Sequence, residues 1–369
     1  MIYTIPDYYK EFHCAADKCE DTCCAGWQIV IDKKSLKKYR GVRGKFMPKM
    51  HTSVCWLKGT FHQDAEKRCA FLNEKNLCEM YVALGEESLC KTCRRYPRHV
   101  EEFEGVREIS LSISCPVVAR MLMERKSPVT FLSFEKEGEE EYEDFDPFFF
   151  SILEDAREEM IKILQNRTLS IRTRVLQVLG MAHDMQGRIN RQEMFACSDV
   201  IEKYRGDRAK VYAKNYLEKI NIPMSEPLFD RLYCLELLRE NWELLLHETE
   251  TILYAKGEKV YQKIEEAFRD WMKEHPEMEI RLEQLLVYFL FTYFPGAVYD
   301  GEIFAKAQMA VYLSFMIREL WMARWVKNEK TLDLDECVDL VYRFSREVEH
   351  SDVNLKRVEH MMEKKWFLI

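Results

Sequence analysis

The sequence predicts a mostly α-helical protein in which a small, irregular, cysteine-rich domain precedes a larger, all-helical domain. Glycine accounts for only 13 of the 369 residues, whereas the helix-forming residues Leu, Glu, Lys, Met and Arg are plentiful. Ten of the thirteen cysteines fall within the first 115 residues. The chain is long enough for two domains, each with its own core.

The N-terminal cysteines have the spacing of metal ligands. They run Cys-x4-Cys-x3-Cys-Cys in a first block, Cys-x8-Cys-x11-Cys-x2-Cys in a second, and end in a single cysteine. Thiolates bind zinc in fours and [4Fe-4S] clusters in fours, so the spacing leaves the metal open. Neighbouring cysteines point in different directions, so we expect one of the adjacent pair to ligate a main site and the other to serve a second site or the core. The predicted ligands are Cys14, Cys19, Cys23, Cys24, Cys69, Cys78, Cys90, Cys93 and Cys115.

A disulfide scaffold or unrelated thiols are the alternatives. The N-terminus lacks a basic stretch followed by an apolar one, as a secretory signal would have, so we expect a cytoplasmic protein whose thiols stay reduced. The longest apolar run, residues 285–294, is about half of the roughly 20 residues that a membrane helix needs. We therefore expect no membrane association.

The charges divide along the chain. Residues 1–126 carry 22 Lys and Arg against 17 Asp and Glu, and residues 127–369 carry 33 against 46. The basic part would tolerate an anionic set of thiolates, and the acidic part would attract a lysine-rich partner, although solvated helix faces alone would explain both. Neither part has the strongly basic character of a nucleic-acid-binding domain, so we expect no nucleic acid partner.

The predicted elements follow in chain order. Short strands are expected at 27–32 and 106–113 in the cysteine-rich domain, residues 1–127. An acidic run ended by Pro147 predicts a linker over 128–147, because like charges resist compaction. Apolar residues at three- and four-residue steps predict helices throughout the helical domain, residues 148–369. The expected helices span 148–165, 170–186, 207–220, 227–248, 252–274, 277–293, 302–327, 334–349 and 353–366.

Several motifs carry a resemblance to a known family. In the first hundred residues they are Phe12-His-Cys14, Cys19-Glu-Asp-Thr-Cys23-Cys24-Ala-Gly-Trp27, Cys69-Ala-Phe-Leu72, Cys78-Glu-Met-Tyr81 and Cys93-Arg-Arg-Tyr-Pro97. Later come Ser114-Cys115-Pro116, Tyr293-Phe-Pro295, Tyr299-Asp300-Gly301 and Glu349-His350-Ser-Asp-Val-Asn354. The chain resembles the flagellin lysine-N-methylase branch of the zinc- or iron-chelating cysteine-cluster proteins. Its first block departs from the shorter Cys-x2-Cys-x2-Cys-Cys of the wider group.

The resemblance implies methyl transfer from S-adenosylmethionine to lysine side chains of flagellin, in a protein with a [4Fe-4S] cluster or zinc. It also implies that the helical domain, residues 148–369, binds the donor and the substrate. A methyl acceptor must be a neutral amine, which calls for a nearby carboxylate or tyrosine, and aromatic faces stabilise the sulfonium donor. The aromatic segment 288–300 places rings beside an acid, so Tyr293 and Asp300 are the predicted catalytic residues. These rings are alternatively core residues, and Asp300 with Gly301 a turn.

Four residues are predicted to bind the cofactor. Tyr299 belongs to the same aromatic segment, and His350 and Asn354 are four residues apart and would share a helix face. Arg94 follows Cys93 and would bind a carboxylate or neutralise a cluster. The alternatives are a hydrogen-bonded structural role for His350 and a solvated loop around Arg94.

Two other functions stay open from the sequence. One is a redox or radical iron–sulfur enzyme acting on a small substrate. Radical S-adenosylmethionine enzymes would show Cys-x3-Cys-x2-Cys, whereas Gly26 occupies the third of these positions after Cys19 and Cys23. The other is a non-enzymatic metal-binding assembly factor of the flagellum.

Overall fold

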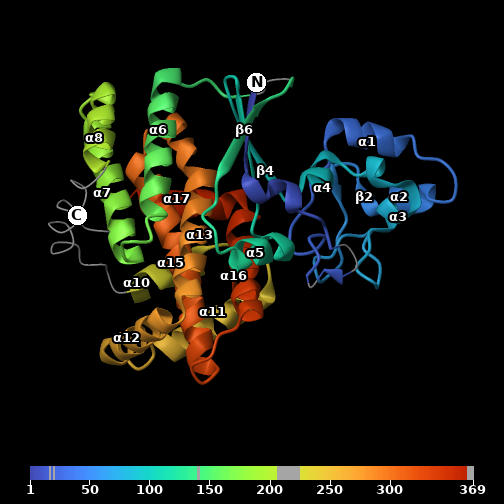
Figure 1. Ribbon diagram of the computed structural model, residues 1–369. Helices are drawn as coiled ribbons and strands as arrows, with labels where there is room; N and C mark the ends of the chain where they lie inside the picture. The colour runs from blue at the N-terminus through green and yellow to red at the C-terminus, as the bar shows by residue number, and fades with distance from the viewer. Residues whose placement is uncertain (16–17, 20, 139–141, 206–224, 364–369) are drawn as a thin grey trace.

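The computed structural model describes residues 1–15, 18–19, 21–138, 142–205 and 225–363. It is mostly helical, as predicted. Figure 1 shows a large helical body, a small sheet against one side of it, and a cysteine-rich lobe that projects beyond the sheet. Each named element that follows residue 146 in the described chain is a helix.

The sheet is built from segments that are distant in the sequence. Its order is β4-β5-β1-β6, with β1 parallel to β5 and antiparallel to β6. The strand predicted at 106–113 is confirmed as β5. The predicted linker contains β6, because residues 131–135 pair with the N-terminal strand. The strands are β1 (Ile2–Pro6), β4 (Arg98–Phe103), β5 (Val106–Leu111) and β6 (Phe131–Glu135).

The cysteine-rich lobe has a core of its own. Ile29, Ile31, Tyr39, Phe61 and Phe71 are buried in it, together with two cysteines, Cys69 and Cys90. Its elements are α1 (Lys33–Arg40), α2 (Met47–Ser53), β2 (Val54–Cys55), β3 (Thr60–Phe61), α3 (Glu79–Leu84) and α4 (Lys91–Arg95).

The strand predicted at 27–32 is wrong. Val30 makes only an isolated bridge to Thr60, and no named strand covers this stretch. The reason is the start of α1: Asp32 is its N-cap and accepts a hydrogen bond from the Ser35 backbone at 2.9 Å. A cap residue that begins a helix ends the extended segment before a second pairing can form.

The helical body is organised around α15, which is buried along almost its whole length. Helices predicted at 148–165, 170–186, 252–274, 277–293, 302–327, 334–349 and 353–366 are present with shifted ends, and 207–220 and 364–366 lie outside the described residues. The named α-helices are α5 (Pro116–Glu124), α6 (Pro147–Leu164), α7 (Ile171–Ile189), α8 (Cys197–Tyr204), α10 (Ser225–Phe229), α11 (Glu240–Leu253), α12 (Glu258–Glu274), α13 (Pro276–Tyr293), α14 (Ala297–Asp300), α15 (Ile303–Lys327), α16 (Leu334–Glu349) and α17 (Asp352–Met362).

The single helix predicted over 227–248 is wrong. The chain forms α10, a 3-10 helix at Asp230–Cys234 and α11, with an extended stretch between the last two. The backbone N–H groups of Glu236 and Leu238 donate to the side chains of Asn354 and Glu347 at 2.7 and 2.9 Å. These tertiary hydrogen bonds replace the ones that a continuous helix would make.

One hydrophobic core joins the sheet to the helices, since it contains buried residues of β4, β5 and α5 as well as of every named α-helix from α6 onwards. Residues before the predicted linker therefore contribute to both cores. The buried carboxylate of Glu108 on β5 pairs with Arg157 on α6, a contact that also ties the two layers.

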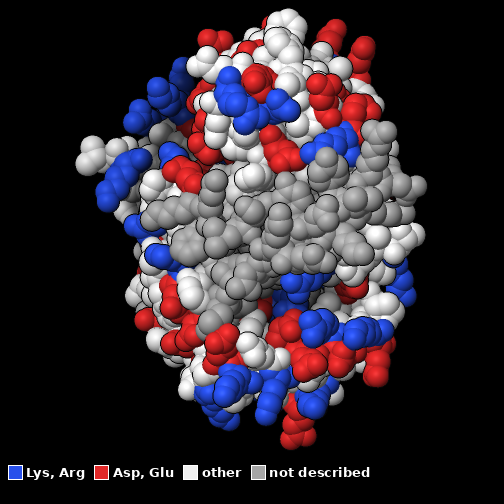
Figure 2. Space-filling model, turned by 90° about the vertical axis from the view of Figure 1, so that its left-hand side faces the viewer, with Lys and Arg blue, Asp and Glu red and all other residues white. Residues whose placement is uncertain are grey.

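No helix among the described residues is long and apolar enough to cross a membrane. On the face shown in Figure 2, basic and acidic side chains are interspersed around the undescribed residues, without a large region of one sign.

Candidate functional site

The nine predicted ligand cysteines lie in two groups. We call Cys14, Cys19, Cys23 and Cys115 the first thiol group. Besides the larger effects of Cys24 and of burial, Cys14 and Cys115 lie near enough to Cys23 to raise its pKa. Burial raises the pKa of Cys115 most, and Cys19 and Cys14 add to this effect. In the second thiol group, the cysteines likewise lie near enough to raise one another's pKa, in addition to the effect of burial. It consists of Cys24, Cys69, Cys78, Cys90 and Cys93.

The second thiol group is part of the core of the cysteine-rich lobe. Cys69 and Cys90 are buried there, and the other three pack against it. The Cys69 backbone N–H donates to the Cys24 carbonyl at 2.8 Å, which joins the two blocks of the sequence. Asp32 accepts hydrogen bonds from the backbones of Ser35 and Lys91, and so fixes the start of α4, where Cys90 is the N-cap.

Two pairs of thiols are hydrogen-bonded, one pair across the two groups and one pair within the second group. A hydrogen bond from Cys23 lowers the pKa of Cys24 to about 7, and one from Cys93 lowers the pKa of Cys90 to about 7. In both pairs one thiol gives up its proton readily and its partner keeps it. Thiolates are the form that binds metals.

The arrangement of the donor side chains limits which metal they could hold. The described residues include no set of three or more Cys, His, Asp or Glu side chains arranged to hold a metal ion. A single zinc ion requires four ligands at about 2.0–2.3 Å from one point. In a [4Fe-4S] cluster the four thiolates need not share a point, because each binds a different iron. The sulfur-rich, grouped donors therefore suit a cluster in their chemistry, and the described side chains do not converge on one ion.

Arg346 on α16 fastens the first thiol group to the helical body. Its buried guanidinium donates to the Ser114 carbonyl at 2.8 Å and to the Asp21 carbonyl at 2.9 Å, and forms an ion pair with the Asp21 carboxylate. Asp21 lies between Cys19 and Cys23, and Ser114 precedes Cys115. Arg239 pairs with the same Asp21 carboxylate. One side chain thus holds the two segments that carry this group.

A polar chain continues from Ser114 to a carboxylate at the end of α16. The Ser112 and Ser114 hydroxyls are 2.7 Å apart, and Ser112 lies 3.5 Å from Glu349 Oε2. Tyr288 and Tyr293 donate to the same oxygen at 2.5 and 2.8 Å. Burial raises the pKa of Glu349, against these hydrogen bonds.

His350 lies on the other side of Ser114. Its Nε2 is 2.9 Å from the Ser114 hydroxyl, and its ring packs against Trp27 and Tyr96 with centroids 4.9 and 5.6 Å away. Burial, helped by the charge of Arg346, lowers the pKa of His350 to about 3. The imidazole is therefore neutral near pH 7, and it forms its hydrogen bond with Ser114 as an uncharged ring.

Two of the residues predicted from the sequence are thus brought together, Tyr293 and His350, with Glu349 between them. Tyr299 lies nearby: Glu101 raises the pKa of both tyrosines, although burial has the larger effect on each. Glu101 also lies 2.7 Å from His99, whose ring is 5.9 Å from that of Tyr293.

The other predicted residues lie in different settings. Asp300 accepts from the Glu302 backbone at 2.9 Å and lies 3.0 Å from Lys306 Nζ. Arg94 is exposed and lies 3.8 Å from the Glu87 carboxylate. Asn354 is buried, and its amide bonds the backbones of Glu236 and Glu347.

Sequence reasoning missed Glu349 and Arg346 as site residues. Glu349 was visible only as the first residue of the motif that contains His350 and Asn354. Arg346 had no signal in the sequence, because its partners Asp21 and Ser114 lie more than two hundred residues earlier in the chain.

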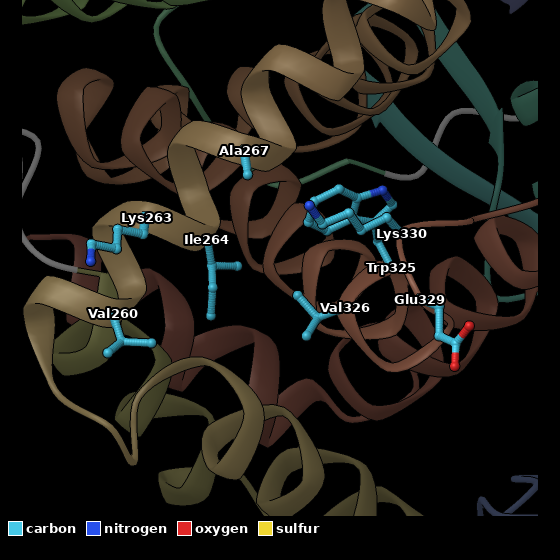
Figure 3. Close-up of a pocket in the computed structure, with 8 residues that line it drawn as sticks. All are labelled: Val260, Lys263, Ile264, Ala267, Trp325, Val326, Glu329 and Lys330. Carbon is cyan, nitrogen blue, oxygen red and sulfur yellow. The ribbon is translucent and has the colours of Figure 1, made fainter.

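A hollow of about 470 Å³ lies away from these groups, between α12 and the end of α15. Figure 3 shows Ile264 and Val326 facing each other across it, with Trp325 beside Lys330. It has no thiol, and its lining is mostly apolar.

Glu347, next to this network, gives a testable pH dependence. It is 1% exposed, and burial raises its pKa to about 7. An unfolded glutamate titrates near about 4.3, so between these values the folded protein binds more protons and the free energy of unfolding falls as the pH rises. The loss should reach a few kcal/mol, at about 1.4 kcal/mol per pKa unit.

Chemical denaturation at about pH 5 and about pH 8 measures this slope. Glu347→Gln should flatten it, whereas the exposed Glu274→Gln should leave it as in the wild type. Equal slopes in the wild type and Glu347→Gln would show that Glu347 does not titrate as described.

Comparison with known proteins adds a family match. Residues 157–368, more than half of the chain, match the family described as "FliB lysine N-methylase C-terminal domain". This range covers the second part of α6 and the helices that follow it, including Tyr293, Glu349 and His350. No solved structure matches the chain significantly.

Three curated proteins are similar to the chain over 128 residues at 29% identity. They are a "Flagellar biosynthetic protein FliU" of Salmonella muenchen and a "Lysine-N-methylase" of both Salmonella typhimurium and Salmonella choleraesuis. The match covers 32% of this chain and 76% of the first protein. In each of the two lysine-N-methylases, the matched region covers 32% of the protein, which is about a third of its length.

Proposed function

Because this chain belongs to the FliB lysine N-methylase family, we propose that it is a protein-lysine N-methyltransferase that uses S-adenosylmethionine to methylate surface lysines of flagellin. The family match is the observation that carries the proposal. The names of the similar Salmonella proteins, a lysine-N-methylase and a flagellar biosynthetic protein, support the reaction and the substrate. A protein with these partners would work in the cytoplasm, without nucleic acid or membrane.

The reaction is a displacement at carbon. The lysine nitrogen bonds to the methyl carbon while the carbon–sulfur bond breaks, and the electron pair of that bond stays on sulfur. The lysine ammonium must first lose a proton, because only the neutral amine has a free electron pair. Alignment of donor and acceptor supplies much of the rate.

We assign the proton-accepting role to Glu349, assisted by Tyr293. The carboxylate is half-buried, and burial raises its pKa towards that of a useful base. It lies beside Tyr288 and Tyr293, whose rings suit a cationic sulfonium or ammonium group. Tyr299 and His350 line the same neighbourhood and are the best placed of the predicted cofactor-binding residues.

The remaining predicted residues keep weaker roles in the proposal. Asp300, Arg94 and Asn354 already have partners within the protein. A catalytic role for Asp300 would require it to leave Lys306. Asn354 supports the site indirectly, by holding the extended stretch before α11 against α16.

The nine clustered cysteines are proposed to hold a [4Fe-4S] cluster, with zinc as the alternative. Such a centre would supply folding energy to the cysteine-rich lobe, as structural metal sites do. The residues of this chain would contribute thiolates, and Arg346 would offset part of their negative charge.

Mass spectrometry of flagellin incubated with the protein and S-adenosylmethionine tests the activity. We expect lysine residues to gain mass in steps of one methylene group, with no external reductant. No gain with excess donor would refute methyl transfer and favour the flagellar assembly factor. A gain that needs a strong reductant would favour radical iron–sulfur chemistry.

A further inference from the structure

We propose that the outer edge of β4 binds an extended, lysine-bearing segment of the protein substrate as an additional strand of the sheet. The inference rests on the proposed function and deepens it, by naming the conformation in which the substrate binds and the surface that receives it. The bound segment would lie beside the tyrosines and carboxylates of the candidate site.

The backbone of β4 is turned partly away from the sheet. β4 is the last strand on its side in the order β4-β5-β1-β6. The Ser112 backbone N–H donates to the Pro97 carbonyl at 2.7 Å, and Arg98 lies opposite Leu111 in the register of β4 and β5. Hydrogen-bonded pairs alternate along an antiparallel ladder. The N–H and C=O groups of Arg98 and Val100 therefore point away from β5.

These outward groups can receive another strand. The backbone hydrogen bonds that the described residues form outside their helices and strands include none to Arg98 or Val100. Both residues are half-buried and so remain within reach of solvent. A sheet edge with such groups is a template for a further strand, and addition of an extended peptide to an edge is a common mode of peptide recognition.

One face of β4 belongs to the candidate site. The His99 ring lies 5.9 Å from that of Tyr293, and the Phe103 ring stacks on that of Tyr299 at 6.3 Å. Glu101 lies between His99 and Phe103 and shares their face, because side chains alternate along a strand. A strand added at the edge of β4 would place every second side chain on this face, in line with the two tyrosines.

The charges on this face suit a lysine. A lysine opposite Glu101 on the added strand would be its cross-strand neighbour, with Cβ atoms about 5 Å apart, and opposite charges attract at this spacing. Glu349 provides a second carboxylate, because it accepts a hydrogen bond from Tyr293 at 2.8 Å. Burial raises the pKa of Tyr299, and the nearby Glu101 and Glu143 raise it further. A lysine at this position would therefore meet both carboxylates and tyrosine rings.

The site is open where the added strand would pass. The side chains of His99 and Glu101 are 34% and 40% exposed, and Tyr299 is 43% exposed. Residues of the core proper would be closed to a substrate, whereas these three are partly covered by the protein and partly accessible. A bound segment would complete their burial and keep water from the reacting groups.

Val100→Pro tests the docking edge. Proline removes the outward N–H and places its ring on that side, but it is tolerated at an edge position whose N–H does not bond to the neighbouring strand. We expect at least about tenfold weaker binding of flagellin, measured by calorimetry without the methyl donor. Val100→Thr keeps the N–H and the branched shape and should bind as the wild type does. Wild-type affinity in Val100→Pro would overturn the proposal.

Modified peptides test the same edge on the unaltered protein, so that the result does not depend on whether a variant folds. The probes are short synthetic peptides copied from surface segments of flagellin, each with one lysine and with one backbone amide N-methylated at a time. Alternate amides of a strand face its neighbour. Backbone N-methylation should therefore weaken binding at every second position and leave the positions between them unaffected. Equal affinities at all positions would contradict binding as a strand.

Glu101→Gln tests where the lysine lies. It should weaken binding of a lysine peptide more than binding of the same peptide with the uncharged norleucine in place of lysine. Equal losses for the two peptides would show that the lysine does not lie beside Glu101.

These outcomes distinguish docking from the reaction itself. If flagellin is methylated and Val100→Pro binds it as the wild type does, the docking edge is wrong and the proposed function stands. If N-methylated peptides show the alternating loss of affinity but no methyl group reaches any lysine, strand docking stands and the proposed methyl transfer is refuted.

Discussion

Glu349→Gln is expected to lower the rate of methyl transfer at least about 100-fold, within the range usual for loss of a general base. Glutamine has nearly the same shape and can still accept hydrogen bonds from Tyr288 and Tyr293, so the fold should persist. It cannot take a proton from the lysine ammonium. The measurement is the initial rate of methylation of flagellin at saturating donor.

The pH profile separates a catalytic role from a structural one. Burial raises the pKa of Glu349, so the wild-type rate should increase with pH through a value above the usual glutamate pKa of about 4.3. That limb should disappear in Glu349→Gln. The exposed Asp335→Asn, on the same helix, should change neither the rate nor the profile.

Substitution of the residues predicted from the sequence refines this test. Tyr293→Phe removes one donor to Glu349 and should slow the reaction less than Glu349→Gln does. Asp300→Asn loses the ion pair with Lys306 and would slow turnover if the aromatic segment forms the site. A Glu349→Gln enzyme that methylates at the wild-type rate would remove the carboxylate from the mechanism.

Arg346→Gln is expected to reduce the free energy of unfolding by about 3–5 kcal/mol, the usual cost of removing one partner from a buried ion pair. The Arg346 side chain is 2% exposed and holds Asp21 and Ser114 at once. Without it, the segments that carry the first thiol group lose their shared anchor on α16. Urea denaturation measures the change.

Arg343→Gln is the matched control for this prediction. Arg343 lies on the same helix and pairs with Asp339 at 2.8 Å, but its side chain is 36% exposed. Exposed pairs contribute about 0–1 kcal/mol. Asp21→Asn combined with Arg346→Gln should cost less than the sum of the single variants, because both remove the same contact. Equal losses for Arg343→Gln and Arg346→Gln would show that Arg346 is not an anchor.

Local patterns were sufficient for much of the fold. Helices such as α13, α15 and α16 follow from apolar spacing and from start and stop residues that lie within each segment. The strand β5 was also visible, because its residues alternate locally. The cysteine pattern marked the lobe, since ten of the thirteen cysteines lie within 115 residues.

Tertiary contacts overrode local pattern elsewhere. The segment before α11 has helical spacing, but Glu347 and Asn354 hold its backbone in an extended form. The stretch before α1 alternates like a strand, but Asp32 caps the helix instead. Before α11 the hydrogen-bond partners lie more than one hundred residues later in the chain, whereas the cap at Asp32 is local, three residues from Ser35.

The sequence by itself therefore determined the helical class and the cysteine-rich lobe, and it predicted the metal-binding cysteines and the aromatic segment 288–300. Only the tertiary structure divided the thiols into two groups, placed Glu349 beside Tyr293, and brought Arg346 to Asp21. The physical reason is distance along the chain. Periodicity reports which face of an element is buried, whereas pairings such as Arg346 with Ser114, 232 residues apart, depend on how whole elements pack.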